Sequence, residues 1–333
     1  MKLLVTGGAG FIGSNFIRHI LKKYPDYKVI NFDKLTYAGN LDNLRDVENS
    51  PRYGFARGDI CDAKIIDNLV SKKPDAIINF AAETHVDRSI SDPDAFIKTD
   101  ITGTKTLLEA AKKYKISRYI QISTDEVYGS IEKGSFSEDA PLNPQNPYSA
   151  SKAAADLMVR AYVNTYNIPA IITRSSNNYG FYQYPEKIIP LFITNLLERK
   201  KIPLYGDGLN IRDWLFVLDN CEAIDLVLHK GSDGEIYNIG GGNELTNLEL
   251  THLILSHLDK GEDRIEYVKD RPGHDRRYSI DFSKIKLLGW EPKHSFGNGL
   301  LETVDWYREN EWWWKKIKSG EYAVYYRDQY EKN

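Results

Sequence analysis

Tyr148 and Lys152 are the pair of side chains whose types and spacing most directly suggest chemistry. They lie four residues apart in the segment YSASK, at 148–152, where a helical pattern begins. This spacing puts both on one face of a helix, and an ammonium group near a phenol lowers its pKa, which is about 10 when unperturbed. A phenolate could then accept a proton from an alcohol while hydride leaves the neighbouring carbon. The spacing alone fits a surface pair equally well.

Thr124, Asp125 and Glu126 form a second candidate cluster, directly after an expected strand at 118–123. Oxidation and reduction need only Tyr148 and Lys152, with Thr124 donating a hydrogen bond to the reacting oxygen. Two further carboxyl groups suggest an elimination, in which one group removes a proton and its neighbour protonates a leaving hydroxyl. Without that context, loop carboxylates exposed to solvent are the more common interpretation of these two residues.

The glycine-rich segment GGAGFIG at 7–13 predicts a binding site for the phosphates of a dinucleotide. It follows an expected strand at 2–6 and opens an expected helix at 11–24, which is the context that such a site requires. Glycines allow a tight turn and a close approach of backbone N–H groups, and the helix N-terminus adds a favourable dipole. The predicted contacts are Gly7, Gly10, Phe11, Ile12 and Gly13.

Asp33 ends the next expected strand, at 28–33, 20 residues after Gly13. A carboxylate there binds the adenosine ribose hydroxyls and favours NAD over NADP, although the adjacent Lys34 leaves NADP open. Asp59, and Ala81 and Ala82 after an expected buried strand at 75–80, lie where a cofactor would pass. Asp59 could equally cap a helix that begins near residue 62.

These candidates require alternating strands and helices to position them. Further helices are expected at 62–72, 94–114, 148–166, 218–229, 246–258 and 300–318, and further strands at 170–175 and 235–239. The alternation predicts an α/β fold, a Rossmann-type doubly wound parallel sheet with helices on both faces. We assign 1–176 to this NAD-binding domain, with 210–240 returning to it. The segments 177–209 and 241–333 are expected to form a smaller α/β C-terminal lobe that binds substrate at the carboxyl edge of the sheet.

Composition excludes several other classes of protein. The 333 residues are 41% hydrophobic and 27% charged, with a net charge of −3 and no long basic block, so no nucleic-acid partner is expected. No apolar stretch approaches the roughly 20 residues that span a bilayer, so no membrane partner is expected either. Cys61 and Cys221 form no metal or redox motif, and His274 has no second ligand at metal spacing. We expect a soluble cytoplasmic protein without a metal site.

The motifs together resemble the extended short-chain dehydrogenase/reductases that act on nucleotide sugars, over nearly the whole chain. The similar segments are TGGAGFIG at 6–13, FDKLTYAGN at 32–40, FAAETHVDRSI at 80–90, STDEVYG at 123–129, YSASK at 148–152, RSSNNYG at 174–180, PEKIIP at 185–190, YGDGLNIRDW at 205–214 and DRPGHDRRY at 270–278. Within this family, epimerases usually have small residues at Asp125 and Glu126, and decarboxylases and GDP-mannose dehydratases resemble STSE. The triplet TDE and the loop KLTYAGN favour the members that dehydrate dTDP-glucose.

The resemblance implies NAD as cofactor, dTDP-glucose as substrate and a homodimer. On the cofactor side it implies contacts from Asp33, Thr36, Ala38 and Gly39 to the adenosine, from Asp59 and Ile60 to the adenine, and from Thr99 and Asn178 elsewhere. On the substrate side it implies Ser89 and Asn177 at the sugar or diphosphate, and Lys187, Arg212, Asn247, Arg271 and His274 at the diphosphate and thymidine. Ile188, Pro203, Tyr205 and Asp270 complete the expected substrate site. Apolar positions in excess of one stripe on the helices at 94–114 and 148–166 support a dimer.

The mechanism implied is an oxidation that is reversed within the same turnover. Tyr148 would take the proton of the sugar 4-hydroxyl while hydride leaves carbon 4. Glu126 would remove the proton at carbon 5, Asp125 would protonate the departing 6-hydroxyl, and hydride would return to carbon 6. Thr124 and Lys152 would stabilise the charge that develops. The alternatives are a 4-epimerase or decarboxylase of the same family, and a regulator that senses NAD(H) without turnover.

Overall fold

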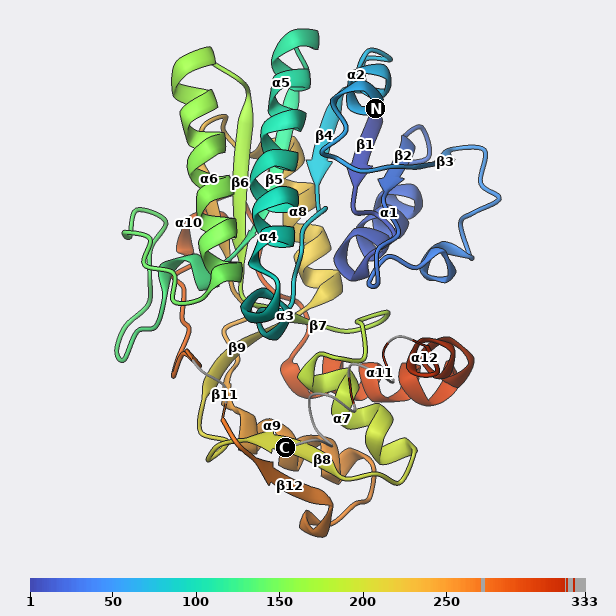
Figure 1. Ribbon diagram of the computed structural model, residues 1–333, viewed down its shortest axis with the longest axis vertical. Coiled ribbons are helices and arrows are strands. Elements are labelled where there is room, and N and C mark those ends of the chain that lie inside the picture. Colours follow the sequence, from blue (N-terminus) through green and yellow to red (C-terminus); the bar gives the residue numbers. More distant parts are fainter. Residues whose placement is uncertain (271–272, 321, 323–325, 327–333) are drawn as a thin grey trace.

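A sheet of seven parallel strands forms the centre of the larger domain (Figure 1). The computed structural model describes residues 1–270, 273–320, 322 and 326. In spatial order the strands are β10 (Ile236–Ile239), β6 (Ala170–Ser175), β5 (Arg118–Thr124), β4 (Ala76–Asn79), β1 (Lys2–Thr6), β2 (Lys28–Asp33) and β3 (Tyr53–Arg57). Every neighbouring pair is parallel, which confirms the predicted Rossmann-type sheet.

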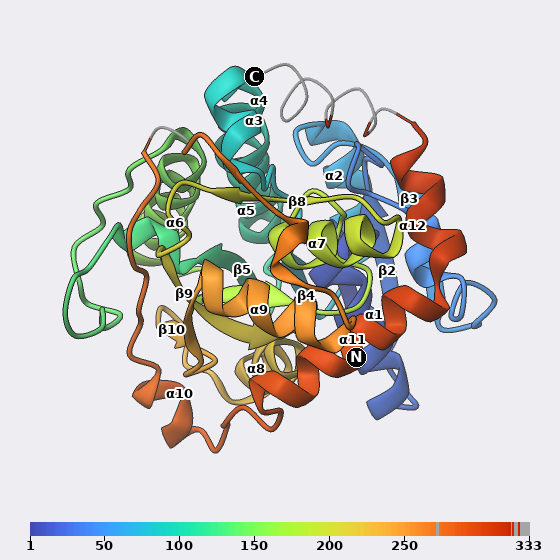
Figure 2. The same ribbon diagram turned by 90° about the horizontal axis from the view of Figure 1, so that it is seen from below.

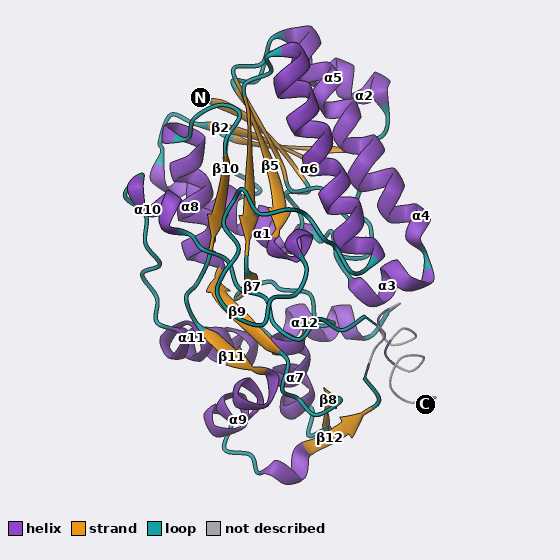
Figure 3. Cartoon of the chain, turned by 90° about the vertical axis from the view of Figure 1, so that its left-hand side faces the viewer, coloured by secondary structure: helices purple, strands orange, loops and turns teal. Residues whose placement is uncertain are grey.

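Helices cover both faces of this sheet (Figure 3). Successive residues of a strand point to opposite faces, so Leu3 and Val5 pack on one side and Leu4 on the other. The first face is covered by α1 (Phe11–Lys23) and α8 (Val217–Lys230), and the second by α2 (Ala63–Val70), α5 (Thr104–Tyr114) and α6 (Pro147–Tyr166). Both faces are therefore buried, as parallel sheets require.

The order of the strands reverses between β1 and β4. From β1 the chain proceeds outward through β2 and β3, and then returns to the other side to build β4, β5, β6 and β10. The loops that leave β1 and β4 consequently diverge, and they open a crevice at the carboxyl edge of the sheet. Ligands bind at this point in open α/β folds.

A smaller lobe lies against that carboxyl edge (Figures 1 and 2). It contains a three-stranded sheet, in which β9 (Ile211–Phe216) pairs with β7 (Asn177–Tyr179) and β11 (Glu244–Thr246), and a pair formed by β8 (Ile202–Tyr205) and β12 (Ile265–Val268). Its helices are α7 (Ile188–Leu197), α9 (Asn247–His257), α11 (Phe296–Glu309) and α12 (Glu311–Lys318), which share one apolar core. The short α10 (Ser283–Leu287) lies beside β10.

The chain after residue 176 crosses between the two parts more than once. β9 belongs to the smaller sheet, whereas α8 packs on α1 and β10 pairs with β6. The segment that returns to the larger sheet therefore begins with α8. Among the described residues, no helix combines the length and apolar character needed to cross a membrane.

Two expected helices differ from the prediction. The one expected at 94–114 is preceded by α3 (Val86–Ser91), starts as α4 (Pro93–Phe96) and continues into α5 through a π-helical segment, Ile97–Gly103. The one expected at 300–318 is two helices, since Asn310 leaves the helical region with φ −112° and ψ 41°. Two other elements were not predicted from the sequence. They are β3, a half-exposed strand without apolar alternation, and α7, whose Pro190 is tolerated because it lies in the first turn.

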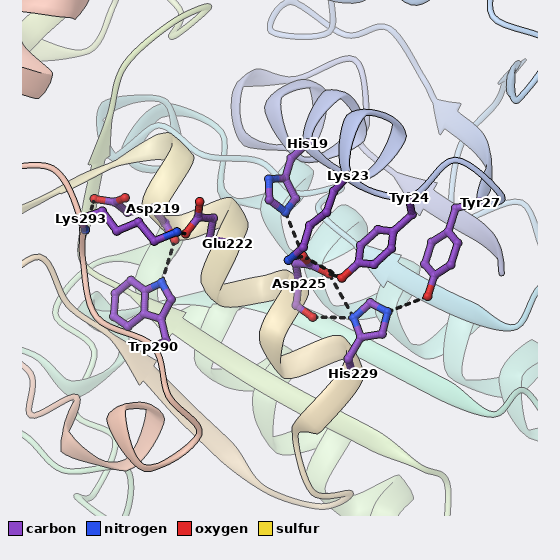
Figure 4. Close-up of polar contacts among 10 residues, drawn as sticks. All are labelled: His19, Lys23, Tyr24, Tyr27, Asp219, Glu222, Asp225, His229, Trp290 and Lys293. Carbon is purple, nitrogen blue, oxygen red and sulfur yellow. Dashed lines mark hydrogen bonds and ion pairs between the residues drawn. The ribbon is translucent and has the colours of Figure 1, made fainter.

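A buried carboxylate, Asp225, joins the two helices on the first face of the sheet (Figure 4). From α8 it accepts hydrogen bonds from Lys23 Nζ at 2.6 Å and Tyr24 Oη at 3.0 Å, and it lies 2.9 Å from His19 Nε2 and 3.0 Å from His229 Nδ1. Burial alone would raise the pKa of Asp225, but these partners hold it well below its usual range. The N-terminus of α1 lies at the glycine turn, where the phosphates are expected to bind. By holding α1 in place, the Asp225 carboxylate therefore also helps to position that phosphate site.

Replacing Asp225 with Asn should lower the free energy of unfolding by about 2–3 kcal/mol near neutral pH, because it removes a buried negative charge that contacts Lys23, His19 and His229. The hydrogen bond with Asp225 raises the pKa of His229. That contribution is complete below the unfolded pKa of histidine and is lost as pH rises through the folded one. Urea unfolding should therefore show a larger difference between parent and variant at pH 6 than at pH 9.

The control for this experiment is Asp67→Asn, which removes an exposed ion pair with Lys113. It should have a much smaller effect at both pH values. Equal losses in the two variants would contradict a stabilising role for Asp225.

Candidate active site

The glycine turn brings the start of α1 against the carboxyl ends of β1 and β4. Gly7 has φ +68°, and a Cβ atom there would lie 2.5 Å from the backbone nitrogen of Ala81. A Cβ atom on Gly13 would lie 2.5 Å from the carbonyl oxygen of Gly7. Gly10 is the N-cap of α1 and has no side chain to cover the helix N-terminus. These contacts leave backbone N–H groups open to an anion at this end of the helix.

Asp33 and Lys34 follow β2 at the same edge. Asp33 accepts hydrogen bonds from the backbone nitrogens of Ala9, at 2.9 Å, and Leu35, at 2.8 Å. Lys34 Nζ lies 2.9 Å from Asp59 Oδ2, so its charge is already paired with a carboxylate. The pairing favours ribose hydroxyls over a 2′-phosphate. Asp62, and not Asp59, caps α2 through the backbone nitrogens of residues 64 and 65.

Tyr148 and Lys152 lie in the first turns of α6, as predicted. The helix begins with Asn146 as N-cap, in a capping box with Ser149. Lys152 is buried, and its Nζ donates a 2.7 Å hydrogen bond to the carbonyl oxygen of Ile122 in β5. Burial, followed by the negative charge of Glu126, raises the pKa of Tyr148 well above its ordinary value. This direction is opposite to the lowering that the spacing with Lys152 predicts, and in the free protein the phenol keeps its proton. A bound NAD⁺ would add a positive charge that favours the phenolate.

Thr124, Asp125 and Glu126 occupy the end of β5 and the single 3₁₀ turn Asp125–Tyr128. The Thr124 hydroxyl donates to Asp125 Oδ1 at 3.2 Å and accepts from the Glu126 backbone nitrogen at 3.3 Å. Asp125 is 2% exposed, and burial together with the neighbouring charge of Glu126 raises its pKa well above the usual value. A raised pKa favours the protonated form of the carboxyl group, which makes Asp125 a potential acid.

Asp100 and Glu83 are site residues that the sequence analysis missed. Asp100, in the π-helical segment, accepts hydrogen bonds from Ser151 Oγ at 2.6 Å and from the Glu83 backbone nitrogen at 3.1 Å. Burial raises the pKa of Asp100 to about 6, and burial and Asp100 raise that of Glu83 to about 7. The position of Glu83, just after β4, was a usable signal, whereas only tertiary packing brings Asp100 beside the start of α6.

One elongated cavity contains every residue predicted to contact the cofactor and all five predicted catalytic residues. It extends from Gly7, Gly10, Phe11, Ile12 and Gly13, past Asp33, Lys34, Thr36, Ala38, Gly39, Asp59, Ile60, Ala81, Ala82 and Thr99, to Thr124, Asp125, Glu126, Tyr148, Lys152 and Asn178. Unpredicted lining residues are Phe32, Gly58, Phe80, Glu83, Thr84, Ile122, Ser123, Ser175, Ser176, Tyr182, Gln183, Tyr184 and Glu186. Many of them adjoin the carboxyl ends of strands.

A second cavity adjoins the first and extends under the smaller lobe. The residues that line both are Thr84, Glu126, Asn177, Asn178, Gln183, Glu186 and Lys187. The second is also lined by the predicted substrate residues Ile188, Pro203, Tyr205, Arg212, Asn247 and His274. His85, Val86, Asp87, Leu191, Phe192 and Trp214 line it as well and were not predicted.

Cationic and polar groups of the second cavity are held by neighbouring residues. Arg212 Nη2 donates to the carbonyl oxygen of Asp275 at 2.9 Å, and its guanidinium lies 4.3 Å from the centre of the Tyr278 ring. His274 Nδ1 lies 2.6 Å from Asp270 Oδ1, so the carboxylate fixes the orientation of the imidazole. This preorganised basic surface suits a diphosphate.

Two predicted substrate residues in the described part of the chain, Ser89 and Asp270, do not line either cavity. Ser89 is fully buried, and its hydroxyl donates to the carbonyl oxygen of Val86 at 2.6 Å, so the structure does not bring it to the sugar site. Asp270 lies behind His274, where it holds the imidazole. Arg271 lies outside the described residues.

The geometry of the first cavity fits a dinucleotide. The glycine turn leaves the N-terminus of α1 open, because Gly13 has no Cβ atom that would collide with the Gly7 carbonyl oxygen. Asp33 lies at the end of the neighbouring strand, β2. Within the described part of the chain, the buried atoms Asp125 Oδ2 and Asn177 Oδ1 have no hydrogen-bond partner, and both residues line this cavity. Polar atoms left in this way are suited to a bound ligand.

A doubly wound sheet with a glycine turn, and a Tyr–Lys pair beside a threonine in the same cavity, define a dehydrogenase of the short-chain type. Comparison with known proteins gives the particular family. Residues 4–303 match the family model described as GDP-mannose 4,6 dehydratase. The chain belongs to this family.

Individual relatives cover nearly the whole chain. A dTDP-glucose 4,6-dehydratase from Streptomyces niveus is 51% identical over 329 residues, which is 97% of this chain and 98% of the relative. The crystal structure of a dTDP-glucose 4,6-dehydratase from Streptomyces venezuelae, with NAD bound, is 53% identical with a TM-score of 0.94, and covers 96% of this chain and 100% of that one. The UDP-glucose 4-epimerase of Thermotoga maritima, with UDP-glucose, is 31% identical with a TM-score of 0.87, and covers 93% and 100%.

Proposed function

We propose that this protein is a hydro-lyase that converts dTDP-glucose to dTDP-4-keto-6-deoxyglucose and water, with NAD as a cofactor regenerated in each turnover. The observation that carries the proposal is the presence of Asp125 and Glu126 beside Tyr148 in one cavity. An enzyme that only oxidises and reduces needs the tyrosine and Lys152, whereas an elimination needs a second acid and base. The relatives that are dTDP-glucose 4,6-dehydratases are 51% and 53% identical to this chain over almost their full length, and they support the same activity.

Tyr148 acts as the base for the sugar 4-hydroxyl in its phenolate form, which the positive charges of Lys152 and of bound NAD⁺ favour. Lys152 keeps a positive charge near the phenol, and Thr124 donates a hydrogen bond to the oxygen on carbon 4. NAD, when bound, would accept hydride from carbon 4 and return it to carbon 6, while a proton is added back at carbon 5. The ketone at carbon 4 makes the hydrogen on carbon 5 acidic, which prepares the elimination.

Asp125 and Glu126 carry out that elimination. Glu126, shared by both cavities, removes the proton from carbon 5, and Asp125 donates a proton to the 6-hydroxyl, which leaves as water. The two roles need opposite protonation states in adjacent carboxyl groups. Burial and the charge of Glu126 raise the pKa of Asp125 and so keep it in the acid form.

The second cavity binds the nucleoside diphosphate. Arg212 and Lys187 face the two phosphates, and His274 with Asn247 and Tyr205 contacts the thymidine. Asn177, shared by both cavities, lies between the sugar and the diphosphate. With the nucleoside diphosphate bound in this way, Tyr148 lies at the 4-hydroxyl of the hexose and Glu126 lies at carbon 5.

The test of the activity is mass spectrometry after incubation of the purified protein with dTDP-glucose. The expected product is lighter than the substrate by one water, and no free NADH accumulates because the cofactor is reoxidised within each turnover. UDP- and GDP-hexoses in parallel incubations define the base preference. An unchanged mass accompanied by inversion at carbon 4 would instead establish the epimerase alternative.

Glu126→Gln tests the division of labour between the acidic residues. In a single turnover this variant should still oxidise carbon 4, seen as NADH absorbance, because Tyr148 and Lys152 are intact. The rate at which the carbon 5 hydrogen exchanges with deuterated water should fall by about a hundredfold, because the general base has been removed.

The matched control is Glu262→Gln, whose parent side chain is 80% exposed in the smaller lobe. It should exchange at the parent rate. Normal exchange in the Glu126 variant would exclude Glu126 as the base.

We further propose that the protein is a homodimer that pairs through α6 and the α3–α5 region. Leu157 of α6 is 53% exposed and Ile97 of the π-helical segment 51%, and Ile90 and Tyr166 are also exposed there. Such apolar side chains along adjacent helices suit a four-helix interface between two copies. Light scattering should give twice the chain mass, and Leu157→Glu should shift it toward the monomer; a monomeric parent would refute the proposal.

We also infer that the protein works in the cytoplasm. Both cysteines are free, and Cys221 is fully buried with a raised thiol pKa caused by that burial. Free thiols of this kind suit a reducing compartment.

A further inference from the structure

Three loops meet over the first cavity, and we call them the mouth loops. They are residues 34–40 after β2, residues 83–88, which follow β4 and end in the first turn of α3, and residues 181–187 between β7 and α7. Each contributes residues to the cavity wall, including Thr36, Thr84 and Glu186. They are far apart in the sequence, so their contacts are made only by the folded chain.

Glu186 connects all three mouth loops. Its Oε1 accepts a 3.1 Å hydrogen bond from Tyr37 Oη, and its Oε2 accepts a 3.2 Å hydrogen bond from Arg88 Nε. Arg88 also lies over the Tyr37 ring, 3.8 Å from its centre. The three side chains therefore contact each other in pairs, with one from each loop.

Neighbouring contacts strengthen this arrangement. Lys187 Nζ donates a 2.6 Å hydrogen bond to the carbonyl oxygen of Thr84 and so ties the second loop to the third again. The Tyr184 ring meets the Tyr37 ring edge to face, with centres 5.3 Å apart. These contacts join the same loops on either side of Glu186.

The charge distribution opposes separation of the loops. The Glu186 side chain is 1% exposed, while that of Arg88 is 29% exposed. Burial raises the pKa of Glu186, and the nearby cations Lys187 and Arg88 oppose that rise. If the loops moved apart, a buried carboxylate would lose its cationic partner, which is costly in a protein interior.

We propose that Tyr37, Arg88 and Glu186 form a clasp that keeps NAD(H) in the cavity between the two halves of the reaction. The proposal rests on the function proposed above, because an oxidation that is reversed in the same turnover requires that the reduced cofactor stay in place. An enzyme that exchanged its cofactor after each half-reaction would have no use for three loops fastened over it. The clasp residues act on the cofactor through the loops and are positioning residues.

The experiment measures release of the reduced cofactor without any sugar nucleotide. Purified protein loaded with NADH is mixed rapidly with excess NAD⁺, and the loss of bound NADH fluorescence gives the dissociation rate. Tyr37→Phe removes one hydroxyl and leaves the ring against Arg88; Glu186→Gln removes the charge. Each should release NADH at least about tenfold faster than the parent, since each weakens a charge-assisted hydrogen bond.

A matched control is Glu244→Gln, which weakens a comparable Arg–Glu pair, with Arg277 Nη2 2.7 Å from Glu244 Oε1, away from the mouth loops. It should release NADH at the parent rate. Parent-like release from both Tyr37→Phe and Glu186→Gln would overturn the clasp, whether or not the protein dehydrates dTDP-glucose. If Glu186→Gln does not fold, Tyr37→Phe decides alone.

A second readout links the clasp to turnover. With dTDP-glucose and no added NAD, both clasp variants should accumulate free NADH at 340 nm and lose activity with time, and added NAD should restore it. The control variant should do neither. Constant activity without added NAD in the clasp variants would contradict a role in retention, and absence of activity in the parent would count only against the proposed function.

Discussion

The close contact between the first glycine turn and the neighbouring strand end is the constraint on which the rest of the site depends. At Gly7 a Cβ atom would lie 2.5 Å from the Ala81 nitrogen, and at Gly13 it would lie 2.5 Å from the Gly7 carbonyl oxygen. Only glycine lets α1 start so near to β4. That approach sets the helix N-terminus in the crevice where the strand order reverses, and so determines where a dinucleotide begins. Every other group of the site is placed relative to this end.

From there the site is a series of strand ends at one edge of the sheet. Asp33 follows β2, Glu83 follows β4, Thr124 ends β5 and Asn177 lies just beyond β6. Because the strands are parallel, these four residues lie along the same edge of the sheet. Arg212 and His274 of the smaller lobe line the cavity next to that edge. The reacting groups thus come from the rigid sheet and α6, whereas the groups that select the substrate come from the lobe.

Buried charge decides how the acidic residues of this site can differ in chemistry. Asp125 and Glu126 are adjacent in sequence, yet Asp125 is enclosed and Glu126 is open to both cavities. Burial and mutual repulsion favour one proton on the pair, and they favour it on Asp125. The same principle operates at Glu186, whose buried carboxylate connects the three mouth loops. Its negative charge is stabilised there by the ion pair with Arg88.

The sequence by itself determined the parallel sheet, the glycine turn, Asp33, the Tyr148–Lys152 pair and the Thr124–Glu126 cluster, because these follow from local periodicity and from motifs within one strand–helix unit. It could not find α7, whose early proline conceals the helix, or the edge strand β3, which lacks alternation. Only the tertiary structure decided that Ser89 is buried, that Lys34 is paired with Asp59, that Asp100 lies beside α6, and that Tyr37, Arg88 and Glu186 meet. These contacts join residues far apart in the chain, and their existence depends on how the loops of separate strands pack at one edge, which no local pattern encodes.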